Sequence, residues 1–262
     1  MIKLHTQSLV LIALVFAIGG KAIAQEQYKE KKPATAIEIY PGGTFYKVEQ
    51  YEQVKSKKAP KSIILLIGDG MGLSQIHAGM TANGGSLFIQ NFKQIGFSKT
   101  YSADKYVTDS AAGGTALSSG VKTNNGAIGV DANGKAVPSI RELAEKRGLK
   151  TGLVSTSAIN HATPASFIAH EGSRGSYEAI SAQFLLYNID VFIGGGIKFF
   201  EKRTDGRNLS EELRQKGYQV LYDIDEISKV QSGKLAGLTA QEHNPGMPER
   251  GEMLVPATET AI

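Results

Sequence analysis

The sequence predicts an α/β fold, a three-layer sandwich in which a mostly parallel central sheet is flanked by helices. Apolar runs of strand length alternate along the chain with helical patterns, and the connections between them are short. The most apolar run, residues 62–67, is continuous and rich in isoleucine, as expected for a strand that is buried on both faces. Such alternation is typical of doubly wound sheets, whose ligands bind beyond the carboxyl ends of the strands.

The other elements follow from local patterns and end signals. Pro138 near the beginning and Gly148 just past the end mark one helix. The glycine triplet at 194–196 is interpreted as a turn at the end of a strand. Further strands are expected at 150–156, 190–193 and 218–222. Helices are expected at 73–81, 110–119, 138–147, 176–187, 209–216 and 224–230.

The first 24 residues are typical of a secretory signal peptide. They combine a basic beginning, an apolar run at 9–18 that is too short to span a bilayer, and Ala22-Ile23-Ala24 before Gln25. The mature protein is therefore expected in the periplasm or outside the cell, and an uncleaved N-terminal anchor is the alternative. The lysine-rich residues 25–60 are expected to form a peripheral arm before the main domain at 61–262.

Charge and cysteine content narrow the classes of partner. The net charge is +4, and removing residues 1–24 with their two lysines leaves +2. That value is too small to indicate a dedicated nucleic-acid or membrane partner. The chain has no cysteine, so any metal site must use histidine, carboxylates and hydroxyls.

The segment Val107-Thr108-Asp109-Ser110-Ala111-Ala112-Gly113-Gly114-Thr115 carries the main candidate for chemistry. Ser110 follows an aspartate and opens a helix with almost no side-chain bulk behind it. The free N–H groups of a helix N-terminus would hold an anion there. A helix-capping Asp-Ser pair on the surface is the alternative.

Two further segments are expected at the same edge of the sheet. Asp69 follows the run at 62–67 and lies between Gly68 and Gly70, and residues 157–164 bring His161 and Thr163 to the end of another strand. An ordinary turn residue is the alternative for Asp69. A Ser-His-Asp triad is disfavoured because Ser110 lacks the Gly-x-Ser-x-Gly setting, and no P-loop is present. Of the three ways considered to use this serine, activation by bound metal ions is the one that remains.

These segments resemble the alkaline phosphatase family. Residues 107–115 match its active-site signature at every position, and Gly68-Asp69-Gly70-Met71-Gly72 resembles its first metal-binding segment. His161-Ala162-Thr163-Pro164, followed by Ser173-Arg174, resembles its magnesium and phosphate-arginine segment. The resemblance extends from about Ile63 to the last residue.

The resemblance implies a phosphomonoesterase with two zinc ions and one magnesium ion. Ser110 would attack the phosphorus and form a phosphoserine, with one zinc holding its alkoxide and the second supplying hydroxide. Arg174 would clamp two phosphate oxygens, and Asp109 would orient Arg174. Asp69 would bridge zinc and magnesium, and Thr163 would be a further ligand at the magnesium site.

His161 departs from the best-known bacterial pattern, which has aspartate there. We expect it to bind metal in the third site, with weaker magnesium retention and tolerance of zinc; a hydrogen-bonding role is the alternative. His77 and His170 are expected on helix or strand surfaces, and His243 is expected to face solvent.

Several ligands that the resemblance implies have no downstream candidates in this sequence. We therefore expect the chain to be the N-terminal part of a longer protein, nearly inactive and poorly folded alone. Its function would be hydrolysis of small phosphate monoesters by an exported enzyme, and a homodimer of the full-length protein is left open. The alternatives are a secreted phosphate-binding protein and a phosphodiesterase or sulfatase-like hydrolase. Ser110 argues against the latter, whose members usually carry threonine or a modified cysteine.

Overall fold

The computed structural model describes residues 45–52, 58–247 and 249–262. The expected signal peptide and residues 25–44 of the expected arm lie outside the described residues. The chain divides into two compact units: the smaller takes in residues 71–93 and those before 60, and the larger takes in Pro60–Gly70 and Gln94–Ile262. Within the described ranges, no helix has the length and apolar character needed to cross a bilayer.

The smaller unit is organised around Asn83, which follows helix α2 (Leu73–Ala82). The Asn83 amide donates to the carbonyl oxygens of Tyr46 at 3.1 Å and Ser86 at 2.8 Å, and its oxygen accepts from the Tyr46 N–H at 2.9 Å. Tyr46 also stacks on Phe88 in the 3-10 helix η1 (Phe88–Asn91), with ring centroids 5.5 Å apart. The helix expected at 73–81 is confirmed.

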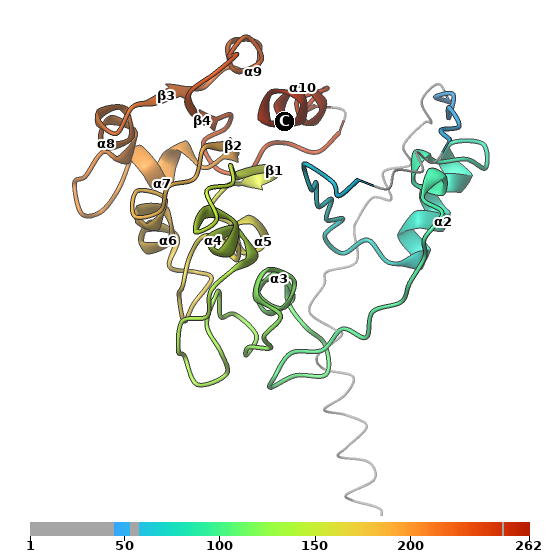
Figure 1. The fold of residues 1–262 in the computed structure, drawn as a ribbon, viewed down its shortest axis with the longest axis horizontal. Coiled ribbons are helices and arrows are strands. Elements are labelled where there is room, and N and C mark those ends of the chain that lie inside the picture. The colour runs from blue at the N-terminus through green and yellow to red at the C-terminus, as the bar shows by residue number, and fades with distance from the viewer. Residues whose placement is uncertain (1–44, 53–57, 248) are drawn as a thin grey trace, which may run out of the picture. The chain divides into compact units, whose positions relative to one another are not determined.

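The larger unit contains a parallel four-stranded sheet (Figure 1). Its strands are β1 (Gly152–Ala158), β2 (Val191–Gly195), β3 (Tyr218–Leu221) and β4 (Lys234–Leu238), in the order β1-β2-β4-β3. Every neighbouring pair is parallel, which confirms the predicted sheet type. Strand β4 was not predicted, although it lies between two strands that were.

Helices connect these strands and flank the sheet. They are α3 (Ser110–Ser119), α4 (Ile140–Glu145), α5 (Ala162–Ala165), α6 (Tyr177–Gln183), α7 (Ile197–Glu201), α8 (Leu209–Gln215), α9 (Ile224–Ile227) and α10 (Leu254–Ala261). The helices predicted from the sequence are all present, with ends that differ by a few residues. The four-residue α5 and the five-residue α7 were not predicted, because both are too short to show a helical period.

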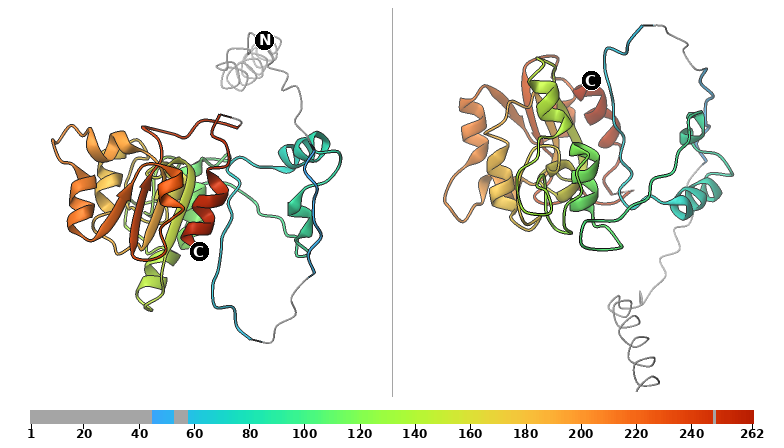
Figure 2. Two further views of the ribbon diagram at one scale, coloured as in Figure 1. Left: turned by 90° about the horizontal axis from the view of Figure 1, so that it is seen from above. Right: turned by 60° about the horizontal axis from the view of Figure 1, so that its bottom comes forward.

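The two faces of the sheet carry separate apolar cores. Phe192 points to one face and packs with Phe184 of α6, at 4.9 Å between ring centroids. Its neighbour Ile193 points to the other face and packs in a cluster with Ile227 of α9 and Ala257 of α10. Successive side chains of a strand point to opposite faces, so helices cover both (Figure 2). The predicted three-layer sandwich is confirmed.

The prediction of a buried strand at residues 62–67 is wrong. The segment has no regular secondary structure and belongs to no strand of the sheet. Its side chains are open to solvent, with Ile63 84% and Leu66 70% exposed. Apolar, β-branched composition favours a buried strand only when neighbouring strands bond to its backbone, and no strand in the described part of the chain does so.

Candidate active site

Helix α3 begins at Ser110, as predicted, because Asp109 caps it. The Asp109 Oδ1 accepts from the Ala112 N–H at 2.9 Å, and the Asp109 N–H donates to the Asn125 Oδ1 at 3.0 Å. Gly120, with φ of 72°, ends the helix. Asp109 is therefore held on both its backbone and its side chain, which fixes where the Ser110 hydroxyl lies.

The small residues after Ser110 allow α3 to approach α5 closely. Ala111 and Ala112 are buried, and a Cβ on Gly114 would lie 2.7 Å from the Ser166 Oγ, at the end of α5. Larger side chains would separate the two helices. The same approach brings Thr163, on α5, toward the first turn of α3.

Asp69 lies between the two hydroxyls. Its Oδ1 accepts from the Ser110 hydroxyl at 3.2 Å, and its Oδ2 accepts from the Thr163 hydroxyl at 2.7 Å. The structure thus brings together these three residues from separate segments of the larger unit. The turn at Gly70, with φ of +68°, directly follows the aspartate.

The donor atoms around Asp69 suit a hard cation. A carboxylate and two hydroxyls offer oxygen ligands, which magnesium prefers. Among the described residues no group of three or more histidine, cysteine, aspartate and glutamate side chains gathers as a metal cluster. The oxygen donors of these described residues therefore fit part of a magnesium ligand set.

Arg174 is held at both ends of its guanidinium. The Nη1 donates to the Asp109 Oδ2 at 3.0 Å, and the Nη2 lies 3.1 Å from the His161 Nε2. Its backbone N–H donates to the Gly126 carbonyl at 2.6 Å. A guanidinium has five N–H donors, so these side-chain contacts leave others for an anion. The arginine side chain is 30% exposed, so an anion can reach it.

His161 turns its Nε2 toward Arg174. Burial, followed by the positive charge of Arg174 and the neighbouring His243, lowers the pKa of His161, while Asp69 acts in the opposite direction. An arginine cannot accept a hydrogen bond, so the Nε2 must carry the lone pair. His161 is therefore a neutral acceptor that orients the arginine in this structure.

His243 is the residue that sequence reasoning missed. Its position is exposed, as expected, but its Nδ1 accepts from the Ala158 N–H at 3.1 Å. Its ring meets that of His161 edge to face, at 5.0 Å and 88°. The missing signal was β4: had residues 234–238 been identified as a strand, His243 would have been expected at the same edge as His161.

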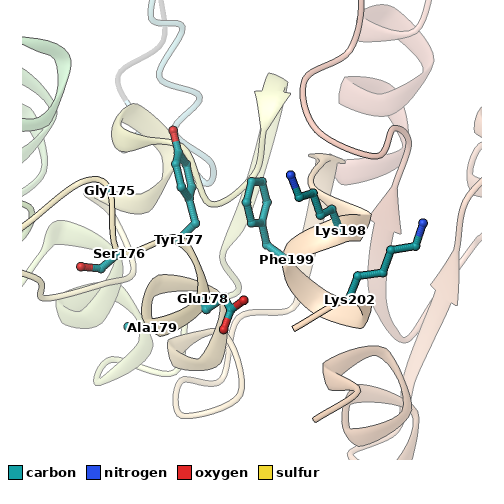
Figure 3. A pocket seen from close by; sticks show the side chains of 8 residues that line it. All are labelled: Gly175, Ser176, Tyr177, Glu178, Ala179, Lys198, Phe199 and Lys202. Carbon is teal, nitrogen blue, oxygen red and sulfur yellow. The ribbon is translucent and has the colours of Figure 1, made fainter. Parts of the chain in front are cut away.

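A cavity of about 350 Å³ is lined by the residues that follow Arg174 in the sequence and by residues of α7 and its end (Figure 3). Its lining is Gly175, Ser176, Tyr177, Glu178, Ala179, Lys198, Phe199 and Lys202. Tyr177 stacks on Phe199 at 4.6 Å, and the His161 ring is nearly parallel to Tyr177 at 6.4 Å. Aromatic rings therefore continue from the arginine site into this cavity.

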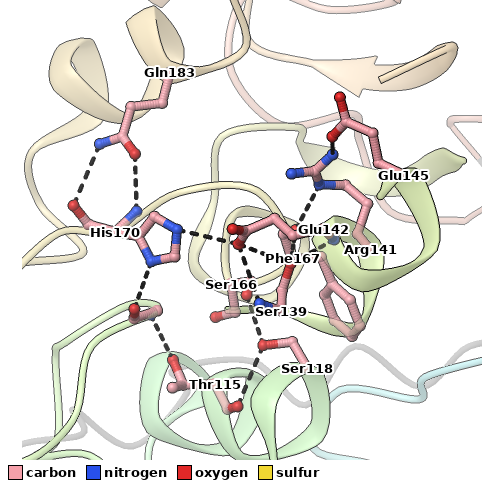
Figure 4. A network of polar contacts seen from close by, with 11 residues as sticks. Thr115, Ser118, Ser139, Arg141, Glu142, Glu145, Ser166, Phe167, His170 and Gln183 are labelled. Atoms are coloured by element: carbon pink, nitrogen blue, oxygen red, sulfur yellow. Dashed lines mark hydrogen bonds and ion pairs between the residues drawn. The ribbon is translucent and has the colours of Figure 1, made fainter. Parts of the chain in front are cut away.

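A polar network connects Thr115 of α3 to residues of other segments (Figure 4). The Thr115 Oγ1 accepts from the Gly129 N–H at 2.9 Å, and the Gly129 carbonyl lies 2.6 Å from the His170 Nδ1. The His170 Nε2 lies 3.1 Å from the Glu142 Oε1, and its side chain is only 14% exposed. The prediction that His170 is a surface residue is therefore wrong, because residues distant in sequence cover it. His77 lies on α2, as expected.

Comparisons with known proteins identify the family of this chain. The family model described as alkaline phosphatase matches residues 60–261. The chain is 37% identical over 240 residues to alkaline phosphatase 4 of Bacillus subtilis, covering 84% of this chain and 52% of that protein.

Solved structures give the same result. Alkaline phosphatase from the Antarctic bacterium TAB5 is 42% identical, with a TM-score of 0.73 over 78% of this chain and 61% of that one. A histidine-to-aspartate mutant of it, with magnesium bound in its M3 site, is 41% identical, with a TM-score of 0.69 over 74% of this chain and 57% of that one. The chain spans about half the length of the curated relatives it matches. On the family match and these similarities, the chain belongs to the alkaline phosphatase family.

Proposed function

We propose that this chain belongs to an exported, metal-dependent phosphomonoesterase that forms a phosphoserine at Ser110. The observation that carries the proposal is that Asp109, which caps α3 before Ser110, also binds the guanidinium of Arg174. A nucleophilic hydroxyl at a helix N-terminus is thereby linked to a planar cation that suits a phosphate group. The family membership supports the same activity.

In the proposed reaction, Arg174 binds the phosphate group of a small monoester and holds it against Ser110. The Ser110 oxygen attacks phosphorus in line and gives up its hydroxyl proton, the bond to the ester oxygen breaks, and the leaving alkoxide takes up one proton to become the alcohol. Water then attacks the phosphoserine and releases inorganic phosphate and free Ser110. Positioning and electrostatic stabilisation provide most of the acceleration in such transfers.

The chain's own residues prepare the serine for this attack. Asp69 accepts the hydrogen bond of the Ser110 hydroxyl and so turns the oxygen's lone pairs away from the carboxylate. Thr163 holds the other Asp69 oxygen, which keeps the carboxylate in place. Asp109 and His161 hold the two terminal nitrogens of Arg174.

We propose that Asp69 and Thr163 hold magnesium and that Asp69 and Ser110 contribute to zinc binding, in a set of two zinc ions and one magnesium ion. Divalent cations bound there would lower the pKa of the serine hydroxyl and offset phosphate charge. The oxygen donors around Asp69 support this assignment, as does the magnesium in the M3 site of the TAB5 mutant. His161 would orient Arg174 and lie at the edge of the third metal site.

The proposed export rests on the signal-peptide pattern of residues 1–24. It also agrees with the absence of cysteine, since the site uses no thiolate that oxidation outside the cytoplasm would damage.

The test compares Ser110→Ala with Ser119→Ala, at the other end of α3, in the protein as its gene encodes it. With zinc and magnesium supplied, acid quenching after labelled phenyl phosphate should trap phosphoserine in the wild type and in Ser119→Ala but not in Ser110→Ala. Retained phosphate binding with no turnover in any form would instead identify a binding protein. Faster hydrolysis of a diester than of the monoester would identify a phosphodiesterase.

A further inference from the structure

We propose that His243 is a positioning residue, which holds the His161 ring so that its Nε2 faces Arg174. The proposal rests on the proposed function, because the consequence of this positioning is tighter binding of phosphate at Arg174. Its structural basis is a line of contacts that runs from the Ala158 N–H through both histidines to the guanidinium.

The backbone that carries His243 is tied to the ends of two strands. The Asn244 N–H donates to the Thr156 carbonyl of β1 at 3.2 Å, and the Lys198 N–H donates to the Gln241 carbonyl at 3.0 Å. A Cβ on Gly195 of β2 would lie 2.0 Å from the Glu242 carbonyl oxygen. The loop thus lies directly on the strand ends, and it presents His243 from a fixed base although the residue is exposed.

The His243 ring is oriented by its own hydrogen bond. Its Nδ1 accepts from the Ala158 N–H at 3.1 Å, and this hydrogen bond fixes which ring nitrogen faces the backbone. The edge-to-face contact with His161 at 5.0 Å is a favourable arrangement for two aromatic rings. Tyr177 lies beyond His161 at 6.4 Å in a nearly parallel orientation. With rings on two sides, His161 has little freedom to rotate its Nε2 away from Arg174.

The two histidines should therefore occupy opposite tautomers when both are neutral. His161 accepts through Nε2, so its proton lies on Nδ1, whereas His243 accepts through Nδ1, so its proton lies on Nε2. This difference is a spectroscopic signature of the arrangement, and it does not depend on catalytic activity.

The substitutions separate the two contacts of His243. His243→Phe keeps a ring beside His161 but loses the acceptor for the Ala158 N–H, and His243→Asn keeps an acceptor but loses the ring. His243→Ala loses both. His77→Ala, a substitution of the histidine on α2, is the matched control.

Inhibition by inorganic phosphate is measured for each variant in the protein as its gene encodes it, with metals supplied, in wild-type and His161→Ala backgrounds. We expect His243→Ala to raise the inhibition constant about threefold to tenfold, the range of one neutral hydrogen bond, with a smaller effect on kcat. The Phe and Asn variants should retain part of the affinity, and His77→Ala should retain all of it. In the His161→Ala background, His243→Ala should have no further effect.

Equal effects of His243→Ala in the two backgrounds would overturn the proposal, since His243 would then act without His161. Nitrogen-15 NMR of the histidine rings provides the second readout: His161 should lose its single tautomer in His243→Ala, and an unchanged tautomer would also overturn it. A failure of the proposed function would give a different result. In that case Arg174→Ala would leave phosphate binding unchanged. The NMR measurement would still show whether His243 positions the His161 ring.

Discussion

The Nη2 of Arg174 lies 3.1 Å from the Nε2 of His161, while its Nη1 donates to the Asp109 Oδ2 at 3.0 Å. One neighbour is a carboxylate and the other a neutral imidazole, so the net charge around the arginine is more positive than it would be between two carboxylates. Such an arginine is well suited to bind an incoming dianion.

Asp109→Asn should weaken inhibition by inorganic phosphate about tenfold. The new amide group would face the Arg174 Nη1 and the Gly126 N–H, which are both donors, whereas the capping oxygen toward Ala112 can remain. A charge-assisted hydrogen bond is worth about 1.5–3 kcal/mol, and partial exposure of both partners favours the lower value. Asp131→Asn is the control, because the hydrogen bonds of its turn use only one of the two carboxylate oxygens. This substitution should leave the inhibition constant for phosphate unchanged.

Acidification should destabilise the metal-free protein through His161. Burial first, and then Arg174, lower its pKa below the ordinary value of 6.5. Its contribution to stability is therefore complete above about pH 6.5, where both folded and unfolded forms are neutral, and it is lost as the pH falls through the lowered value. The urea concentration at the midpoint of unfolding is measured at decreasing pH, starting from neutral. It should decrease less for His161→Gln than for the wild type. An equal decrease in the two proteins would contradict the role of His161 in this pH dependence.

His161→Asp should bind magnesium more tightly than the wild type. The substitution adds an oxygen ligand and a negative charge near Asp69, whereas imidazole is a poor ligand for magnesium. Magnesium titration, followed by calorimetry or by protection against thermal unfolding, measures the difference. His161→Asn keeps the shape without the charge and serves as the control, and equal affinity of all three proteins would refute the prediction.

Gly114→Ala should destabilise the larger unit by about 1–3 kcal/mol, the usual cost of overpacking. Its Cβ would lie 2.7 Å from the Ser166 Oγ and 3.0 Å from the Ser166 Cβ, so α3 and α5 would have to separate. Gly113→Ala is the neighbouring control, because its nearest contact would be 3.8 Å away and alanine favours the helix. Unfolding midpoints should move in opposite directions for the two variants.

Sequence reasoning succeeded where the determining signals are local. Helix α3 occupies the residues expected for it, because Asp109 at its N-cap and Gly120 after its end are both encoded beside it. It was less successful where contacts with residues distant in the sequence determine the structure. Residues 62–67 were predicted to be buried on their apolar composition, but burial also requires neighbouring strands. Asp69 nevertheless lies beside Ser110 and Thr163.

The opposite error concerned β4, a strand that was not predicted. The strand has no β-branched residue in its sequence, Lys234-Leu235-Ala236-Gly237-Leu238. Its intrinsic β-strand propensity is therefore low, and pairing with the parallel strands on both sides stabilises it. Without β4, the loop after it could not be placed at the active-site edge. The exposure of His243 was predicted correctly, but its contact with His161 was not. The geometry of His161 toward Arg174 likewise depends on orientation, which composition does not encode.

The open run at Ile63–Ile67 also has a consequence for the behaviour of the protein in concentrated solution. An exposed apolar segment that is rich in isoleucine and belongs to no strand can pair with identical segments of other molecules. Lys61 precedes the run and Asp69 follows it, and such flanking charges slow self-association. Replacing Lys61 with an apolar residue would remove one of these barriers and promote fibrous aggregation.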